Sequence, residues 1–279
     1  MLCRTFLPRR PQFTMTSFAL WLVSALLQPV PYLYAQRATT VEDLTRQATL
    51  IFKGTVEKTA ASTMPAVKAT KETAVVRVDQ LIDSPGAPPG LTGKQITVEM
   101  LESGSTKPGA QAIFFTKGWL LGKSMAVIEV GQLPATESTG GLSEKVKSIR
   151  QQISDEALQN QMATAEAVVA GQVTAVRPSE IPHLDTEHDP DWYVATIRVE
   201  SVIKGQLKDR EVAVLFPHSD DVAWHNSPKF KEGQQGIWLL HRNQARLPGI
   251  ENQLTALRPL DFHSREELSR IERLAKASQ

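Results

Sequence analysis

The sequence predicts a mainly β fold made of two tandem five-stranded barrels, each with a helix at its N-terminal and C-terminal ends. The first observation is a repeat: the segment from about residue 44 to 132 recurs, with drift, from about residue 162 to 260. The second is that each copy consists of short apolar runs separated by glycine-containing turns, which is typical of strands. Five short strands protect their edges by closing into a barrel, because closure leaves no unpaired backbone at an edge.

The first predicted strand of each copy is an apolar run interrupted by a glycine. Residues 48–56 read ATLIFKGTV, and residues 165–173 read AEAVVAGQV. Gly54 and Gly171 hold the same position in the two runs. Glycine inside a strand marks a bulge or a tight bend, so we expect each first strand to bend at this point.

The second predicted strand gives the clearest match between the copies. Residues 74–82 correspond to residues 195–203, and the alternation of apolar and polar positions indicates a half-buried strand. Arg77 and Arg198 occupy the same polar position. We interpret both as outward strand residues paired with a neighbouring acid. The alternative is that each arginine marks a ligand-facing surface.

The remaining strands of each copy follow at matching intervals. Gly109 and Gly233 lie at the turn before a strongly apolar fourth strand. The third, fourth and fifth strands are expected at residues 91–98, 107–115 and 125–130 in the first copy, and at residues 207–214, 231–239 and 253–257 in the second.

Helices are expected before and after each barrel. Each begins with a serine or threonine that fits the N-cap position. Ser264 and Glu267 also have the spacing of a capping box. The predicted helices begin at Thr40, Ser143, Ser154 and Ser264. Because one helix ends and the next begins near Ser154, we place the first domain at residues 36–153 and the second at residues 154–279.

A set of alanine, glycine, β-branched and lysine positions in the two copies indicates the type of barrel. These positions are Ala48, Gly54, Val78, Gly109, Ala165, Gly171, Val199, Ile203, Lys204, Gly205 and Gly233. Their order resembles the netrin-like or TIMP-like domain, an OB-type five-stranded barrel with helices at both termini. Animal members carry disulfides and an N-terminal cysteine, whereas Cys3 is the only cysteine of this chain. The resemblance is therefore to a disulfide-free, bacterial-type version, and it does not imply protease inhibition.

Residues 1–35 have the features of a secretory signal peptide. Three arginines within the first ten residues precede an uncharged stretch at residues 18–27, and Leu33-Tyr-Ala35 offers a cleavage site. The apolar stretch is too short to cross a bilayer comfortably, so no stable membrane span is expected after cleavage. The alternatives are an uncleaved signal anchor and a start at Met15. We expect an exported protein, either periplasmic or extracellular.

The charge balance argues against nucleic acid as a partner. Residues 1–35 contain three of the 31 basic residues and none of the 30 acidic residues, so the remainder has a formal net charge of about −2. Binding to nucleic acid needs a basic face that neutralises phosphates. The few aromatic residues also fall mainly within apolar strands and do not form a stacking platform.

The candidate chemistry lies in two loops of the second copy. All six histidines fall between residues 183 and 263, and the first copy has none. Loops on a rigid scaffold commonly carry function, so this divergence singles out the second copy. Imidazole and carboxylate groups suit zinc, nickel or copper, and carboxylates alone suit calcium. The candidate ligands of a divalent metal ion are His183, Asp185, His188, Asp189, Asp191, His218, Asp220 and His225.

No motif of a known enzyme class accompanies these loops. Ser219 lies between His218 and Asp220, but neighbours in sequence rarely form a working triad. We therefore expect a non-enzymatic binding module without a cofactor, which recognises a protein or an envelope component through the loops of the second domain. The alternative is a metal-binding or metal-dependent exported protein, and a third hypothesis is a structural spacer that binds nothing. The candidate ligand-binding residues are Arg198, Trp192 and Trp224.

Overall fold

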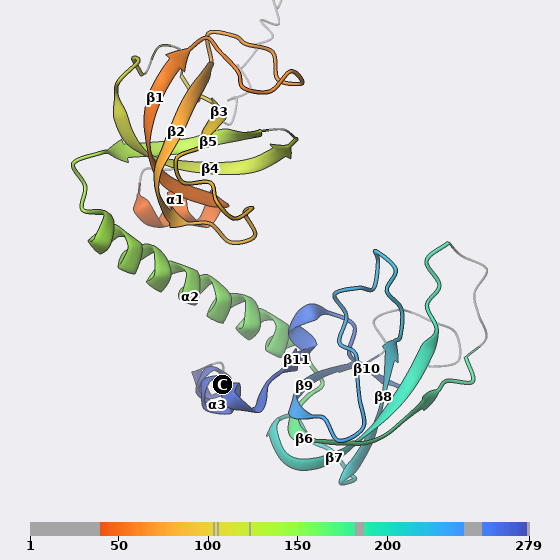
Figure 1. The fold of residues 1–279 in the computed structure, drawn as a ribbon. Helices are drawn as coiled ribbons and strands as arrows, with labels where there is room; N and C mark the ends of the chain where they lie inside the picture. Colours follow the sequence, from red (N-terminus) through yellow and green to blue (C-terminus); the bar gives the residue numbers. More distant parts are fainter. Residues whose placement is uncertain are drawn as a thin grey trace, which may run out of the picture. The chain divides into compact units, whose positions relative to one another are not determined.

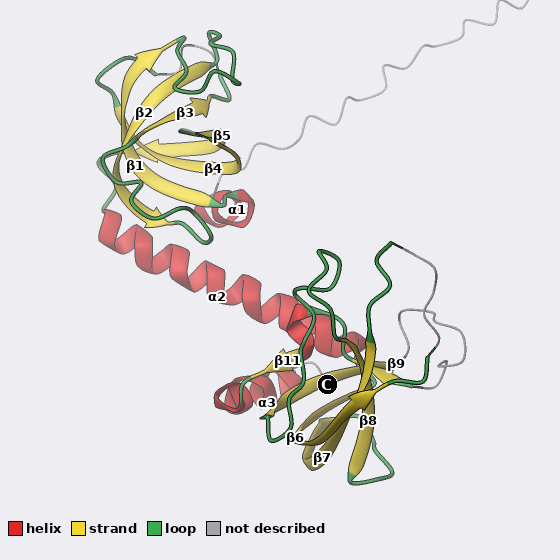
Figure 2. Cartoon of the chain, turned by 45° about the vertical axis from the view of Figure 1, so that its right-hand side comes forward, coloured by secondary structure: helices red, strands yellow, loops and turns green. Residues whose placement is uncertain are grey.

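The computed structural model describes residues 40–102, 104, 106–122, 124–181, 187–242 and 253–277. These residues belong to one compact unit, Ala38–Gln279. The predicted signal peptide and its alternatives lie outside the described residues. Two parts of the chain are rich in strands, and a long helix follows the first and precedes the second (Figure 1, Figure 2).

The first barrel contains five strands. They are β1 (Leu50–Thr59), β2 (Thr73–Asp83), β3 (Gln95–Glu99), β4 (Gln111–Leu121) and β5 (Met125–Pro134). The strand order is β1-β2-β3-β5-β4, and β4 pairs back to β1, so the barrel is closed (Figure 1). The β3–β5 pair is parallel, and every other pair in this barrel is antiparallel.

The second barrel repeats this arrangement. Its strands are β6 (Ala167–Pro178), β7 (Trp192–Lys204), β8 (Glu211–Pro217), β9 (Gln235–Arg242) and β10 (Leu254–Thr255), and β11 (Phe262–His263) is added beside β9. The short β10 pairs in parallel with β8 and antiparallel with β9, which closes the ring. The predicted fold class, mainly β with two tandem five-stranded OB-like barrels, is confirmed.

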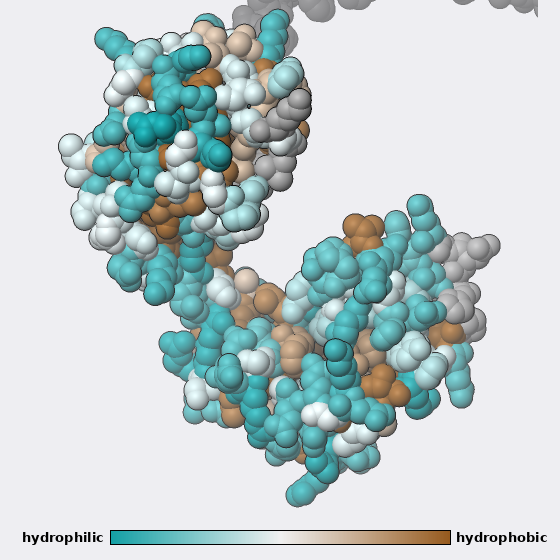
Figure 3. Space-filling model, viewed as in Figure 1, coloured by the Kyte–Doolittle hydropathy of each residue, from teal (hydrophilic) through white to brown (hydrophobic). Residues whose placement is uncertain are grey.

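Each barrel encloses its own apolar core. The rings of Phe52 and Phe114 stack 5.3 Å apart inside the first barrel. Inside the second, the ring of Trp238 lies 6.1 Å from that of Phe230 and 5.7 Å from that of Phe262. On the face shown in Figure 3, hydrophobic residues are scattered among hydrophilic ones. Because the interiors are packed with side chains, candidate sites have to lie on the outer faces and in the loops.

The first strands bend at their glycines, as predicted. The register of β1 against β2 shifts between Lys53 and Gly54, and that of β6 against β7 shifts between Ala170 and Gly171. A Cβ atom at Gly171 would lie 2.3 Å from the carbonyl oxygen of Arg198, so no side chain fits there. The strands approach this closely because residue 171 is a glycine.

Helix α2 (Thr139–Thr164) is one continuous helix where the sequence predicts two. Its N-cap is Ser138 rather than Ser143. Ser154 lies inside α2, and its hydroxyl accepts a hydrogen bond from an arginine of the C-terminal helix at 2.9 Å. No glycine or proline occurs between residues 142 and 164, so nothing in this stretch favours a break. The domain boundary predicted between residues 153 and 154 falls within α2.

Two shorter helices, α1 (Val41–Gln47) and α3 (Leu268–Ala277), lie near the ends of the described chain. Thr40 caps α1 as predicted, because its hydroxyl accepts a backbone N–H of the first turn at 3.1 Å. The predicted capping box of Ser264 and Glu267 does not form: the Ser264 side chain makes no cap hydrogen bond, and the Glu267 carboxylate pairs with an arginine of α3 at 2.8 Å. No helix in the described ranges is long and apolar enough to cross a membrane.

The two ends of α2 belong to different cores. Leu142 and Val146, near its start, are buried together with α1 on the outer face of the first barrel. Leu158 and Met162, near its end, are buried with α3 on the outer face of the second barrel. The middle of α2 is polar, as is typical of a helix that runs through solvent between two packed units.

A cation caps the C-terminus of the helix that precedes the second barrel. The Lys204 ammonium, at the end of β7, donates to the carbonyl oxygens of Met162, Ala163 and Ala165 at 2.5, 3.0 and 2.9 Å. The last carbonyl groups of a helix lack intrahelical partners and carry partial negative charge. Lys204 therefore holds the end of α2 against the barrel.

In the first barrel, Asp83 stands at the position equivalent to Lys204, as the registers of the two strand pairs show. Its carboxylate accepts a hydrogen bond from Arg150 Nε at 2.9 Å. The same guanidinium donates to the carbonyl oxygen of Ala48, the C-cap of α1, at 2.8 Å. An arginine of α2 held by Asp83 thus takes the place of the strand lysine.

Candidate functional site

Two loops of the second barrel carry most of the candidate residues. The first loop, residues 179–191, connects β6 to β7, and the second loop, residues 218–234, connects β8 to β9. Residues 182–186 of the first loop, which include the predicted ligands His183 and Asp185, lie outside the described residues.

The two loops contact each other through His188. Its Nδ1 lies 3.1 Å from Oδ1 of Asp221 in the second loop. The indole N–H of Trp224, also in the second loop, donates to the carbonyl oxygen of His188 at 2.6 Å. The loops therefore form one continuous surface, although 33 residues separate His188 from Asp221 in the sequence.

A small apolar cluster holds both loops against the outer face of the barrel. Trp192, at the start of β7, is only 5% exposed, and its ring meets that of Trp224 edge-on at 5.6 Å. Aromatic rings favour this arrangement because the positive edge of one faces the negative face of the other. Trp192 is thus placed to support the surface rather than to offer its own face to a ligand. The other members of the cluster are Ile181, Val194, Leu215 and Leu257.

Asp221 organises the start of the second loop. Its carboxylate accepts the backbone N–H of Ala223 at 2.8 Å, and its own N–H donates to the hydroxyl of Ser219 at 3.1 Å. The Ala223 N–H and His188 hold the pKa of Asp221 below its ordinary value, while partial burial acts in the opposite direction. The Ser219 hydroxyl is therefore engaged in the local turn of the loop.

Lys229 fixes the other end of the second loop. Its ammonium donates to the carbonyl oxygens of Pro217 and Trp224, each at 2.9 Å. Burial lowers the pKa of Lys229, and the negative charge of Asp220 acts against this effect. Charge-assisted hydrogen bonds of this kind are stronger than neutral ones, so they hold the loop in a defined conformation.

A group of exposed side chains surrounds this fixed base. The ring of His218 lies over that of Tyr193 with centroids 4.7 Å apart. Val222 is 74% exposed in the second loop. We call this group the exposed rim; it consists of His188, His218, Asp220, Val222 and His225.

Of the predicted metal ligands, His188 makes the contact between the loops, and its partner Asp221 was not predicted as a ligand. His188 faces Asp221, His218 covers Tyr193, and Nδ1 of His225 lies 2.9 Å from a carbonyl oxygen of its own loop. In the part of the chain that the structure describes, no three His, Cys, Asp or Glu residues are arranged to hold a metal ion. The remaining described candidates, in the first loop and on the exposed rim, are Asp189, Asp191 and Asp220.

Arg198 does not belong to the loop surface. It is exposed on β7 and donates to an amide oxygen of β6 at 2.8 Å. It lies six residues beyond Trp192, which corresponds to about 20 Å along a strand. Its counterpart Arg77 has the acidic partners predicted for this position, Glu57 at 3.1 Å and Asp79 at 2.9 Å.

Sequence reasoning missed a buried polar cluster that joins α2 to the second barrel. His241 Nε2 lies 3.0 Å from Oδ1 of Asp261, and both side chains are almost completely buried. Gln161 of α2 donates to the same carboxylate, and Arg258 Nη1 donates to the Gln161 amide oxygen at 3.0 Å. Buried polar groups require such partners, so we assign this cluster a structural role. Its signal in the sequence is His241, a polar residue near the end of an apolar strand.

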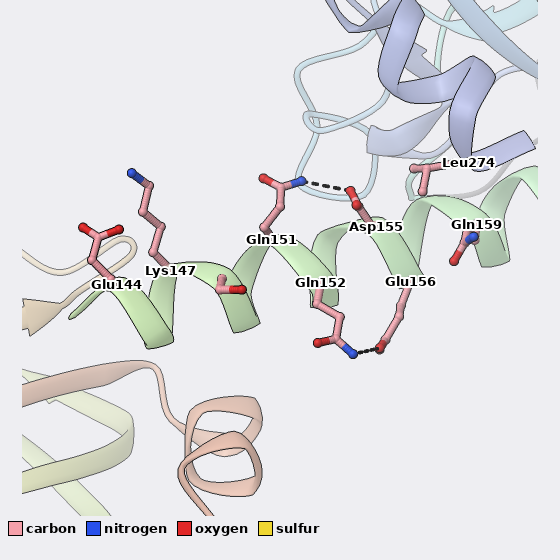
Figure 4. Close-up of a pocket in the computed structure, with 9 residues that line it drawn as sticks. Glu144, Lys147, Gln151, Gln152, Asp155, Glu156, Gln159 and Leu274 are labelled. Carbon is pink, nitrogen blue, oxygen red and sulfur yellow. Dashed lines mark hydrogen bonds between the residues drawn. The ribbon is translucent and has the colours of Figure 1, made fainter. Parts of the chain in front are cut away.

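A polar groove of about 680 Å³ follows the exposed middle of α2 (Figure 4). Within the groove, Gln151 donates to Asp155 at 2.9 Å, and Gln152 donates to Glu156 at 3.1 Å. These pairs lie one helical turn apart and stabilise an exposed helix. Arginines of α3 and α1 also bind the carboxylates of Asp155 and Glu156, each at 2.8 Å. Because its carboxylates already have partners on α1, α2 and α3, the groove offers less for recognition than the two loops do.

The sequence matches no protein-family model and no curated protein. The function is therefore inferred from the geometry of the loops.

Proposed function

We propose that the protein is an exported, non-enzymatic binding module whose two loops in the second barrel recognise a protein or an envelope component. The observation that carries this proposal is the exposed rim, which stands on a base fixed by the Trp192–Trp224 contact and by Lys229. Loops that are already ordered lose less conformational entropy when they bind, so a fixed base favours recognition.

The side chains of the exposed rim suit a partner surface that combines polar, basic and apolar groups. The imidazoles of His218 and His225 can donate and accept hydrogen bonds, and the Asp220 carboxylate attracts a basic group. Val222 adds an apolar contact at a strongly exposed position. Protein recognition commonly combines a few apolar or aromatic contacts with a polar surround.

The test compares two sets of exposed substitutions. The rim variant carries His218→Ala, Val222→Ser and His225→Ala, and the control variant carries Val202→Ser and Lys208→Ala in and after β7. Wild type, rim variant and control variant are cross-linked in an envelope extract, and the captured partner is purified and titrated against each protein. We expect the rim variant to lose binding while all three proteins melt at similar temperatures, because the substituted side chains are exposed.

Point substitutions are preferable to replacement of the whole first loop. Ile181 packs into the apolar cluster and the His188 carbonyl accepts the Trp224 N–H, so removal of the loop would also loosen its support. Equal capture by the rim variant and the wild type would show that recognition occurs elsewhere.

The alternative proposal is a divalent metal ion held by the His and Asp residues of the loops. The His188–Asp221 pair favours it, because an imidazole and a carboxylate from different loops already face each other. Metal content of the purified protein and calorimetry with zinc, copper and calcium test it. Absence of binding to all three ions would leave the metal-free binding module.

A further inference from the structure

The first barrel has an apolar groove on its outer face. The groove has a volume of about 370 Å³, and strands β3, β4 and β5 form most of it. This volume falls within the range of roughly 300–1,000 Å³ that is typical of ligand pockets. The side chains that line it include Val67, Thr97, Glu99, Leu120, Ala126 and Ile128.

Two apolar side chains in the walls of this groove are strongly exposed. Leu120 is 46% exposed and Ile128 is 44% exposed. Among the described residues only five large hydrophobic side chains are exposed, and these two line the same groove. Adjacent exposed apolar side chains in a concave site mark an interaction surface more often than isolated ones do.

The second barrel shows what covers the same face. Strand pairing aligns Glu99 and Ile128 of the first barrel with Leu215 and Thr255 of the second. Leu215 is completely buried, and it belongs to the apolar cluster that contains Trp224. In the second barrel, therefore, an indole on the chain's own second loop covers the outer face.

In the first barrel the β1–β2 connection covers part of this face, because Ser62 and Thr63 bond to the buried Thr97 and Val67 lines the groove, but Leu120 and Ile128 remain exposed. The connection between β3 and β4, residues 100–110, is shorter than the second loop and contains no aromatic residue. The connection between β1 and β2, residues 60–72, also contains no aromatic residue. Neither of these two connections of the first barrel therefore offers a counterpart of Trp224.

We propose that this groove is the docking site of a partner protein that inserts a tryptophan from a turn, with a basic residue beside it. The tryptophan follows from the arrangement in the second barrel. The basic residue follows from Glu99, which is the charged residue in the wall of the groove and is exposed. An indole N–H or a neighbouring cation would pair with its carboxylate.

The closed barrel excludes the other common way of binding a peptide. Addition of a strand needs a free backbone edge, and the five strands of the first barrel pair around the full ring. The groove is therefore recognised through side chains, which agrees with a single large anchor residue.

The test uses the chain's own second loop as the probe. A cyclised peptide with the sequence of residues 217–230, which contains Trp224, His225 and Lys229, is titrated into the ¹⁵N-labelled protein. We expect saturable amide shifts concentrated at the residues that line the groove. The same peptide with alanine in place of its tryptophan should bind about tenfold more weakly or worse.

Matched variants of the protein complete the test. Leu120→Ser with Ile128→Ser should weaken peptide binding by about tenfold or more, whereas Val202→Ser, at a valine 43% exposed in the second barrel, should not change it. The rim variant should bind the peptide like the wild type, which separates this site from the proposed function. The proposal would be overturned by amide shifts confined to the second barrel or by equal binding of the alanine peptide. Undiminished binding by the Leu120→Ser, Ile128→Ser variant would also overturn it.

Discussion

Replacement of Lys204 by methionine should destabilise the second barrel by about 2 kcal/mol. The substitution keeps the length of the side chain and removes the ammonium that contacts three carbonyl oxygens at the end of α2. Hydrogen bonds to a charged group are each worth roughly 1.5–3 kcal/mol. The three bonds share one ammonium, and Lys204 is half-exposed, so water would replace part of the loss. We therefore expect the free energy of unfolding to fall by the contribution of about one such hydrogen bond.

Guanidinium unfolding measured by tryptophan fluorescence provides the assay. Three of the five tryptophans, Trp192, Trp224 and Trp238, lie in the second barrel, so the signal reports mainly on that part of the chain. The expected loss of about 2 kcal/mol corresponds to a fall in melting temperature of about 8–16 °C for a barrel of roughly 100 residues. Lys208→Met, at an exposed loop position, serves as the control and should change stability by less than about 0.5 kcal/mol. A Lys204→Met variant as stable as this control would refute the capping argument.

Three further predictions concern packing and pH. Gly171→Ala should destabilise the protein by about 1–3 kcal/mol, because its Cβ would meet a backbone oxygen at 2.3 Å. Gly140→Ala, in open space on α2, should stabilise the protein by about 0.5–1 kcal/mol. Urea titrations that ranked the two variants in the opposite order would contradict this. Trp192→Ala should cost about 3–5 kcal/mol and also abolish recognition by the two loops, as thermal melts and partner titrations would show; an unchanged melt would mean that the apolar cluster is dispensable. The lowered pKa of Asp221 implies a contribution to stability that is present above the ordinary carboxyl pKa and lost as the pH falls through the pKa in the folded protein. Asp221→Asn should remove this part of the acid dependence, and stability curves of both proteins with the same slope below pH 5 would count against it.

The repeat made the barrels predictable because it supplied the same strand pattern twice. The glycines at residues 54 and 171 mark the same bend, and both bends are present. The helices were harder to predict, because a serine followed by acidic residues fits either an N-cap or the interior of a helix. Ser154 shows this ambiguity: its hydroxyl bonds to α3 rather than to the backbone of α2. The boundary between the helices was therefore predicted where no boundary exists.

The loops of the candidate site were predictable from composition, but their contacts were not. His188 meets Asp221 across 33 residues, and no local pattern encodes such a distance. The burial of Trp192 beneath Trp224 likewise depends on the path of the second loop. His241 and Asp261 were missed for the same reason, since their partner Gln161 comes from α2.

Opposite charges at one repeated position have a consequence for assembly. Tandem copies of a fold are prone to exchange equivalent strands while they form. If β2 entered the second barrel, the carboxylate of Asp83 would face the carbonyl oxygens at the end of α2. If β7 entered the first barrel, the ammonium of Lys204 would face the guanidinium of Arg150. Both errors would bring like charges together, so this pair of residues disfavours the exchange of β2 and β7 between the barrels.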